Sequence, residues 1–137
     1  MANVTAIQTI LDGPSNVVIK LTGLLDTSDV SLSTLIDPAL LSVMDDNTKV
    51  LSNKLRINKI THNIEDLLAV NLFWDATTDV PIGNLVGVYE MDYTKFGGLL
   101  DNSGSGRTGK ILYSTSGWSA SAVLSFVVVL HCTKQYV

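Results

Sequence analysis

A glycine-rich segment in the second half of the chain is the pattern closest to a known chemical site. Residues 104–110 read Gly-Ser-Gly-Arg-Thr-Gly-Lys, which fits the GxxxxGK core of a phosphate-binding P-loop. The full motif continues with Ser or Thr, which holds magnesium, but Ile111 stands at that place. A P-loop also opens a helix whose backbone N–H groups cradle the phosphates, whereas the residues after Lys110 have the pattern of a strand. We therefore interpret residues 104–110 as a glycine-rich loop between strands.

The other residue types that do chemistry are few and scattered. His62 and His131 are the only histidines and lie in separate strand-like segments, so neither belongs to a recognisable zinc or catalytic motif. Asp75 and Asp79 flank a turn without the alternating ligand pattern of a calcium loop, and we expect both to cap the turn. The single cysteine, Cys132, excludes a disulfide within the chain and a multi-cysteine zinc site. We expect no catalytic, cofactor-binding or metal-binding residues, and thus a non-enzymatic protein.

Composition limits the classes of protein to which the chain can belong. Its 137 residues are the usual size of one domain, so we expect residues 1–137 to share a single core. With 46% hydrophobic and only 16% charged residues, the chain is not of the disordered class. A net charge of −4 and scattered basic residues argue against nucleic acid as a partner. The longest apolar run falls far short of the roughly 20 residues of a membrane-spanning helix, and without a secretory signal we expect an intracellular product.

Hydrophobic periodicity predicts β-strands rather than helices. Apolar residues alternate with other residues, or form short runs, in the segments 4–10, 17–22, 55–64, 68–74, 81–91, 110–114 and 123–130. The apolar phase slips between Ile57 and Ile60, which predicts a β-bulge. The run at 123–130 is apolar on both faces, so we expect a strand that is covered on both sides. The predicted core includes Val17, Ile19, Leu21, Val70, Leu72, Phe126 and Val128.

Turn-forming clusters separate the predicted strands and indicate the fold class. Clusters of Asp, Asn, Gly, Ser and Pro at 12–15, 75–79 and 101–106 fit tight connections. Short strands at this spacing predict an all-β fold, an antiparallel β-sandwich of jelly-roll-like type. One long irregular connection, at about 26–54, interrupts the pattern. Within it Pro38 is expected to open a short helical turn as its first residue.

Several side chains are candidates for contact with a partner. Trp118 follows Gly117 in a turn-like segment, where an exposed indole can anchor a protein or stack on a sugar. Residues 1–5 and 133–137 are free of charge runs, and we expect them to be terminal arms that add a strand to a neighbour. The long connection contributes a group of apolar residues. The candidate interface consists of Val4, Leu35, Ile36, Leu40, Leu41, Trp118 and Tyr136.

Several segments together resemble one group of proteins. They are MANVTAIQTILDGP at 1–14, LTGLLDTSDV at 21–30, LFWDAT at 72–77, FGGLLDNSGSGRTGKI at 96–111 and STSGW at 114–118. The chain resembles small virion structural proteins of tailed bacteriophages through most of its length, least across residues 37–54. The resemblance implies a head decoration or cement protein, bound to the major capsid protein on the exterior of the capsid, and assembled in the host cytoplasm. It implies no catalytic residue.

The low charge and high hydrophobicity fit that role, because an apolar surface suits a protein that is covered on assembly. Closed cyclic symmetry would cover the same surface, so we expect a homo-oligomer and favour a trimer. One alternative is a tail or neck component, such as a connector or terminator subunit. Another, from a different class, is a carbohydrate-binding β-sandwich that uses Trp118 and neighbouring acids. The sequence leaves these alternatives open.

Overall fold

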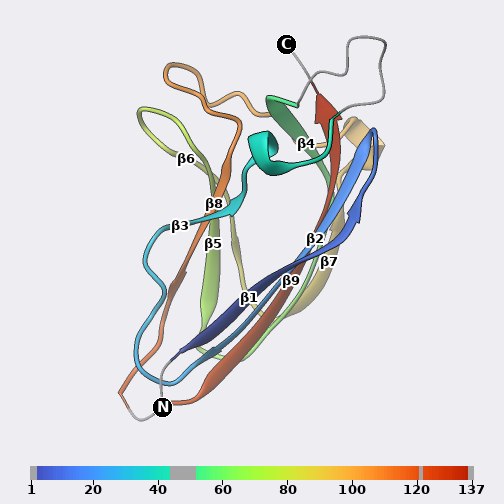
Figure 1. The fold of residues 1–137 in the computed structure, drawn as a ribbon. Helices are drawn as coiled ribbons and strands as arrows, with labels where there is room; N and C mark the ends of the chain where they lie inside the picture. Colours follow the sequence, from blue (N-terminus) through green and yellow to red (C-terminus); the bar gives the residue numbers. More distant parts are fainter. Residues whose placement is uncertain (1–2, 44–51, 121, 136–137) are drawn as a thin grey trace.

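A computed structural model of the chain describes residues 3–43, 52–120 and 122–135. These residues form two antiparallel β-sheets packed face to face (Figure 1), which confirms the predicted all-β antiparallel sandwich. One sheet has five strands in the order β1 (Val4–Asp12), β2 (Asn16–Leu25), β9 (Leu124–Gln135), β4 (Lys54–Ile64) and β7 (Val88–Asp92). The other has four, in the order β3 (Ser33–Ile36), β8 (Ile111–Ser116), β5 (Ala69–Trp74) and β6 (Val80–Leu85). In the described part of the chain no helix has the length and apolar character needed to cross a membrane.

The long strand β9 organises the five-stranded sheet. It pairs with β2 from Leu124 to Thr133 and with β4 from Phe126 to Gln135, so it lies between two strands of similar length. The register with β4 shifts between Ile57 and Lys59. This shift confirms the bulge that the slip in apolar phase predicts.

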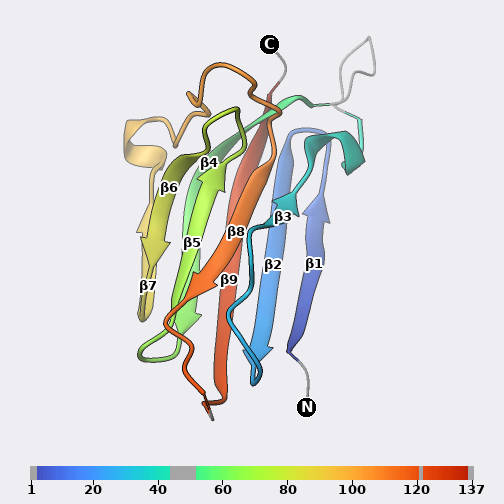
Figure 2. The ribbon, with the colours of Figure 1, turned by 90° about the vertical axis from the view of Figure 1, so that its left-hand side faces the viewer.

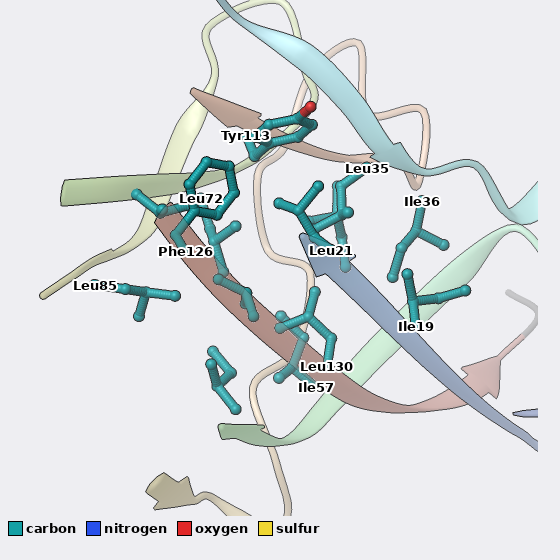
Figure 3. Packing of buried hydrophobic residues seen from close by; sticks show 14 of the residues in the cluster. Ile19, Leu21, Leu35, Ile36, Ile57, Leu72, Leu85, Tyr113, Phe126 and Leu130 are labelled. Atoms are coloured by element: carbon teal, nitrogen blue, oxygen red, sulfur yellow. The ribbon is translucent and has the colours of Figure 1, made fainter. Parts of the chain in front are cut away.

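Alternate residues of both sheets point inward and form one hydrophobic cluster (Figure 3). All seven residues of the predicted core belong to it, and none is more than 3% exposed. Phe126 of β9 lies directly opposite Gly23 of β2, and a Cβ atom at Gly23 would come within 2.3 Å of the Phe126 ring. The glycine therefore leaves the space that the ring fills.

The connection at 26–54 is less irregular than the sequence predicts. Its residues 33–36 form strand β3, which pairs with β8 at the edge of the four-stranded sheet. The 3-10 helix η1 (Pro38–Leu40) follows, with Pro38 at its start and the Asp37 carboxylate accepting a hydrogen bond from the Ala39 N–H at 3.0 Å. The helical turn at Pro38 is thus confirmed, whereas the absence of a strand is wrong. A strand of four residues is too short to produce a clear alternation.

The segment 81–91, expected as one strand, is two strands in different sheets. Strand β6 ends at Leu85 and β7 begins at Val88, and between them Gly87 adopts a φ of +69°. β6 pairs with β5, whereas β7 pairs with β4 in the opposite sheet. Gly87 is a turn-forming residue, but a single glycine is a weaker signal than the clusters of Asp, Asn, Ser and Pro that mark the turns predicted from the sequence.

Strand β9 is buried on one face only, which corrects the expectation of a strand covered on both sides. Phe126 and Val128 point into the core, while Val127 and Val129 lie half-buried on the outer face of the sheet. No other described layer covers this face (Figure 1). The partial shielding comes from the neighbouring strands, because β9 is central in its sheet.

Neither end of the described chain is a free arm, in contrast to the expectation. Val4 and Thr5 are the first residues of β1 and pair with Leu24 and Gly23. At the other end, residues 133–135 continue β9. Each segment therefore already has a strand partner within the same chain. Residues 1–2 and 136–137 lie outside the described residues.

Candidate interaction surface

The two outermost strands of the five-stranded sheet carry large hydrophobic side chains that are exposed. On β1 these are Val4, Ile7, Ile10 and Leu11, which we call the β1 edge; each is between 47% and 57% exposed. At the opposite side of the sheet are Val86, Val88, Tyr89 and Met91, which we call the β7 patch; each is between 41% and 74% exposed. Exposed apolar groups gathered in this way are typical of interaction surfaces.

Both surfaces lie at the margins of the wider sheet. Strands lie about 4.8 Å apart within a sheet, so a five-stranded sheet extends beyond a four-stranded one packed against it. Figure 2 shows β1 and β7 at the two lateral margins of the molecule, with the smaller sheet in front. Every residue of β1 from Val4 to Leu11 is exposed, and so is every residue of β7. These two strands therefore have no covering layer within the described chain.

The β7 patch is held in place by the residues beside it. Tyr89 pairs with His62 of β4, and their rings lie 6.5 Å apart between centroids. His62 is buried, and its Nδ1 atom lies 3.0 Å from the carbonyl oxygen of Gly87. This contact fixes the start of β7 against β4, so the patch is presented on a rigid strand.

A shallow hollow extends the β7 patch onto the outer face of the sheet. Val88 lies there beside the half-buried Val127 and Val129, and the hollow has a volume of about 300 Å³. Thr61 and Asn63 complete its floor, and at its rim Glu90 forms an ion pair with Lys59. The surface is thus mainly apolar with one neutralised charge pair, which suits contact with a protein surface more than with a charged ligand.

The structure separates the interface residues predicted from the sequence. Leu35 and Ile36 are 4% and 2% exposed and belong to the core, so the prediction that they contact a partner is wrong. Their inward packing follows from strand β3, which the sequence did not reveal. In contrast, Leu40 on η1 is 83% exposed, whereas Leu41 is half-buried against the core. Val4 lies on the β1 edge, and Tyr136 lies outside the described residues.

Trp118 packs partly against the core rather than standing free. Its indole Nε1–H donates to the carbonyl oxygen of Ala122 at 3.1 Å, and its backbone N–H donates to the Asp29 carboxylate at 3.1 Å. The indole and backbone donors are thus used to fix the loop between β8 and β9. The residue is therefore half-buried and packs partly against the core.

The glycine-rich segment 104–110 is a loop between strands, as interpreted from the sequence. It runs directly into strand β8, so no helix follows it to bind a phosphate. Thr108 donates its hydroxyl to the Asp75 carboxylate at 2.7 Å and thereby ties the loop to the end of β5. At Gly109, with a φ of +84°, a Cβ atom would lie 2.3 Å from the carbonyl oxygen of Asn53. This glycine is required by close backbone packing.

Asp79, Cys132 and His131 are the other reactive side chains considered in the sequence. Asp79 accepts a hydrogen bond from the Ala76 N–H at 3.2 Å, which confirms its expected place as a turn cap. Burial raises the pKa of Cys132 to about 12, so its reactive thiolate is strongly disfavoured. Burial and the nearby Lys59 lower the pKa of His131. Within residues 3–43, 52–120 and 122–135, no three His, Cys, Asp or Glu side chains gather as a metal site would require.

Sequence reasoning missed most of the two exposed surfaces. Ile7, Ile10 and Leu11 belong to a predicted strand, but periodicity does not reveal that this strand is at an edge. One signal was present: residues 4–11 contain no charge and no Pro or Gly, which is unusual for a strand exposed on both faces. The exposure of Val88 and Tyr89 was not predicted, because residues 81–91 were interpreted as one strand instead of β6 and the edge strand β7.

The class that the geometry defines is an antiparallel β-sandwich with exposed apolar edges. Comparison with models of protein families, with curated proteins and with solved structures finds no match to the chain. The exposed surfaces are therefore the structural features that bear on function.

Proposed function

We propose that the chain is a non-enzymatic structural protein of a tailed-bacteriophage virion, namely a decoration or cement protein that stabilises the head. It binds the major capsid protein on the outside of the capsid and is assembled in the host cytoplasm. The observation that carries the proposal is the pair of exposed apolar surfaces at opposite margins of one rigid sheet. The resemblance of segments such as LTGLLDTSDV to phage virion proteins supports the same role.

The order of the strands supports the jelly-roll-like arrangement that is part of this proposal. From β2 onward, the sheets have the orders β2-β9-β4-β7 and β3-β8-β5-β6. Between β2 and β9, each strand is followed along the chain by a strand of the opposite sheet. The one exception is the pair β5 and β6, which are neighbours in the same sheet. Two-sheet arrangements of eight strands occur in many viral capsid proteins. This is an analogy of fold, and the function rests on the surfaces.

The β7 patch is the surface that we assign to the capsid. Val88 lines the mainly apolar hollow on the outer face, and Tyr89, which lies opposite the buried His62, extends the patch around the free edge of β7. The ion pair between Lys59 and Glu90 is already neutral and needs no charge from a partner. A standard protein interface buries about 1,600 Å² in total. A contact of modest strength that repeats over a shell stabilises the whole particle, so no single contact has to be tight.

A binding assay on particles that lack the protein tests this assignment. The double substitution Val88→Ser/Tyr89→Ser is expected to weaken binding by roughly tenfold or more, because central aromatic anchors contribute most to such contacts. Both side chains are exposed, so the variant should keep the circular dichroism spectrum and melting temperature of the original protein. Binding is measured by sedimentation of particles with added protein.

Leu32→Ser is the matched control. Leu32 is also an exposed apolar residue, at 49%, but it lies in the connection between β2 and β3 and is not part of the β7 patch. Its binding should stay within about twofold of the original protein. Equal binding by all three proteins would contradict the assignment of the β7 patch. The same assay with Leu40→Ser tests the one exposed residue of the predicted interface on η1.

A further inference from the structure

Strand β1 differs from the three other edge strands of the described sheets. β3 has only four residues, β6 contains Pro81 and Gly83, and β7 has five residues with acids at Glu90 and Asp92. Short length, proline and charge are the usual devices that prevent an edge strand from pairing with another chain. β1 is nine residues long and has no Pro, no Gly and no charge before Asp12. Within the described residues, the one such device on β1 is a bulge between Thr9 and Leu11.

Both ends of β1 are fixed, so the strand is presented in a pairing conformation. The Asn3 side chain accepts hydrogen bonds from the backbone N–H groups of Asp26 and Thr27, at 2.9 and 3.0 Å. At the other end, the Asp12 carboxylate accepts a hydrogen bond from the Lys134 ammonium at 2.6 Å. Because the strand is already ordered, adding a further strand costs little conformational entropy.

We propose that β1 pairs with β1 of a second copy of this chain, antiparallel and about a two-fold axis at Ile7. The two five-stranded sheets then form one continuous sheet. This inference goes beyond the proposed function and does not depend on it. An uncharged strand suits a second copy in particular, because identical strands that carried charge would place like charges near one another.

The sequence of β1 is self-complementary about Ile7. In this register Ile7 faces its own copy, Thr5 faces Thr9, Ala6 faces Gln8 and Val4 faces Ile10. Residues directly opposite in an antiparallel pair share a face, and Thr5, Ile7 and Thr9 pair with Gly23, Leu21 and Ile19 on the core side of the sheet. The two Ile7 side chains, each 47% exposed in the single chain, would then cover each other.

Oxidative cross-linking of the purified protein tests the register. Opposite Cα atoms in an antiparallel pair lie about 4.5–5.5 Å apart, within the range of a disulfide. Ile7→Cys should therefore give a disulfide-linked species of twice the 14.7 kDa chain mass. Ala6→Cys is the matched control: in this register its two copies lie on a diagonal, about 7–8 Å apart, and should stay uncross-linked over the same interval. The natural Cys132 is buried and does not compete.

Analytical ultracentrifugation of the original protein and of two lysine variants completes the test. The original protein should be a dimer at micromolar concentration, Ile7→Lys a monomer, and Val88→Lys, on the opposite edge, still a dimer. A monomeric or trimeric original protein would overturn the proposal, and so would cross-linking of Ile7→Cys no faster than that of Ala6→Cys. A trimer would instead agree with the oligomeric state that the sequence analysis favours. No particle is present in these assays, so their failure leaves the particle-binding result untouched.

Discussion

Replacing Phe126 by alanine is expected to lower the free energy of unfolding by about 3–5 kcal/mol. The side chain is 1% exposed and lies between the two sheets (Figure 3), so its removal leaves a cavity that rigid strands on both sides are unable to close. Urea denaturation followed by circular dichroism measures the change. Val123→Ala, just before the same strand at a site 56% exposed, is the control and should cost less than about 0.5 kcal/mol.

A substitution at Gly23 tests the packing of Phe126 from the other side. An added methyl group at Gly23 would meet the Phe126 ring, so Gly23→Ala alone should destabilise the protein by about 1–3 kcal/mol. Because the two residues share the same space, the two effects should not add, and Gly23→Ala should cost less in the Phe126→Ala background. Additive effects, or a loss below about 1 kcal/mol for Phe126→Ala, would contradict the described core.

Replacing Asp12 by alanine is expected to cost about 3 kcal/mol, at the lower end of values for broken buried ion pairs. The Lys134 side chain is fully buried, and its ammonium group donates to Asp12 and to the backbone carbonyl of Ser42. Without Asp12 this charge loses the counter-ion that the described residues provide. Asp12 itself is 21% exposed, so water can reach it when Lys134 is replaced. Lys134→Met should therefore be less damaging than Asp12→Ala. The reverse order in urea denaturation would contradict this assignment.

The same pair predicts a loss of stability in acid. Burial alone would raise the pKa of Asp12, but hydrogen bonds from Lys134 and Ser42 outweigh it and lower the pKa below its ordinary value of 3.8. In acid the folded form then binds fewer protons at this site than the unfolded form. The stabilisation is complete above the ordinary pKa and disappears as the pH falls through the lowered value. Asp12→Asn should lose this part of the dependence of melting temperature on pH, and an unchanged acid transition would contradict it.

Much of the fold could be predicted because a strand with one buried face has apolar residues at alternate positions of the sequence. The alternation in β2, β5 and β9 gave the core, and the slip at Ile57 gave the bulge in β4. Pro38 marked the start of a helical turn because its fixed φ suits that position. In each case the signal is local, within a few residues of the feature that it predicts.

The candidate surfaces depend on relations that are not local. Whether β1 is central or at an edge is decided by which strands lie beside it, and alternation within β1 does not encode this. Leu35 and Ile36 resembled exposed loop residues because the partner of their short strand, β8, lies far along the chain. Val86 and Gly87 change sheets without the polar residues of an ordinary turn. The predicted sites were therefore least accurate where strand order decides exposure.

The number of copies in purified virions, combined with the heat resistance of particles that lack the protein, tests the proposed role most directly. A decoration protein should be present in many copies distributed over the head. Particles without it should release their genome at a lower temperature, and adding the purified protein should restore their resistance. A few copies at one vertex, with full heat resistance and a failure of tails to attach, would contradict a role on the capsid surface and indicate a neck or tail component.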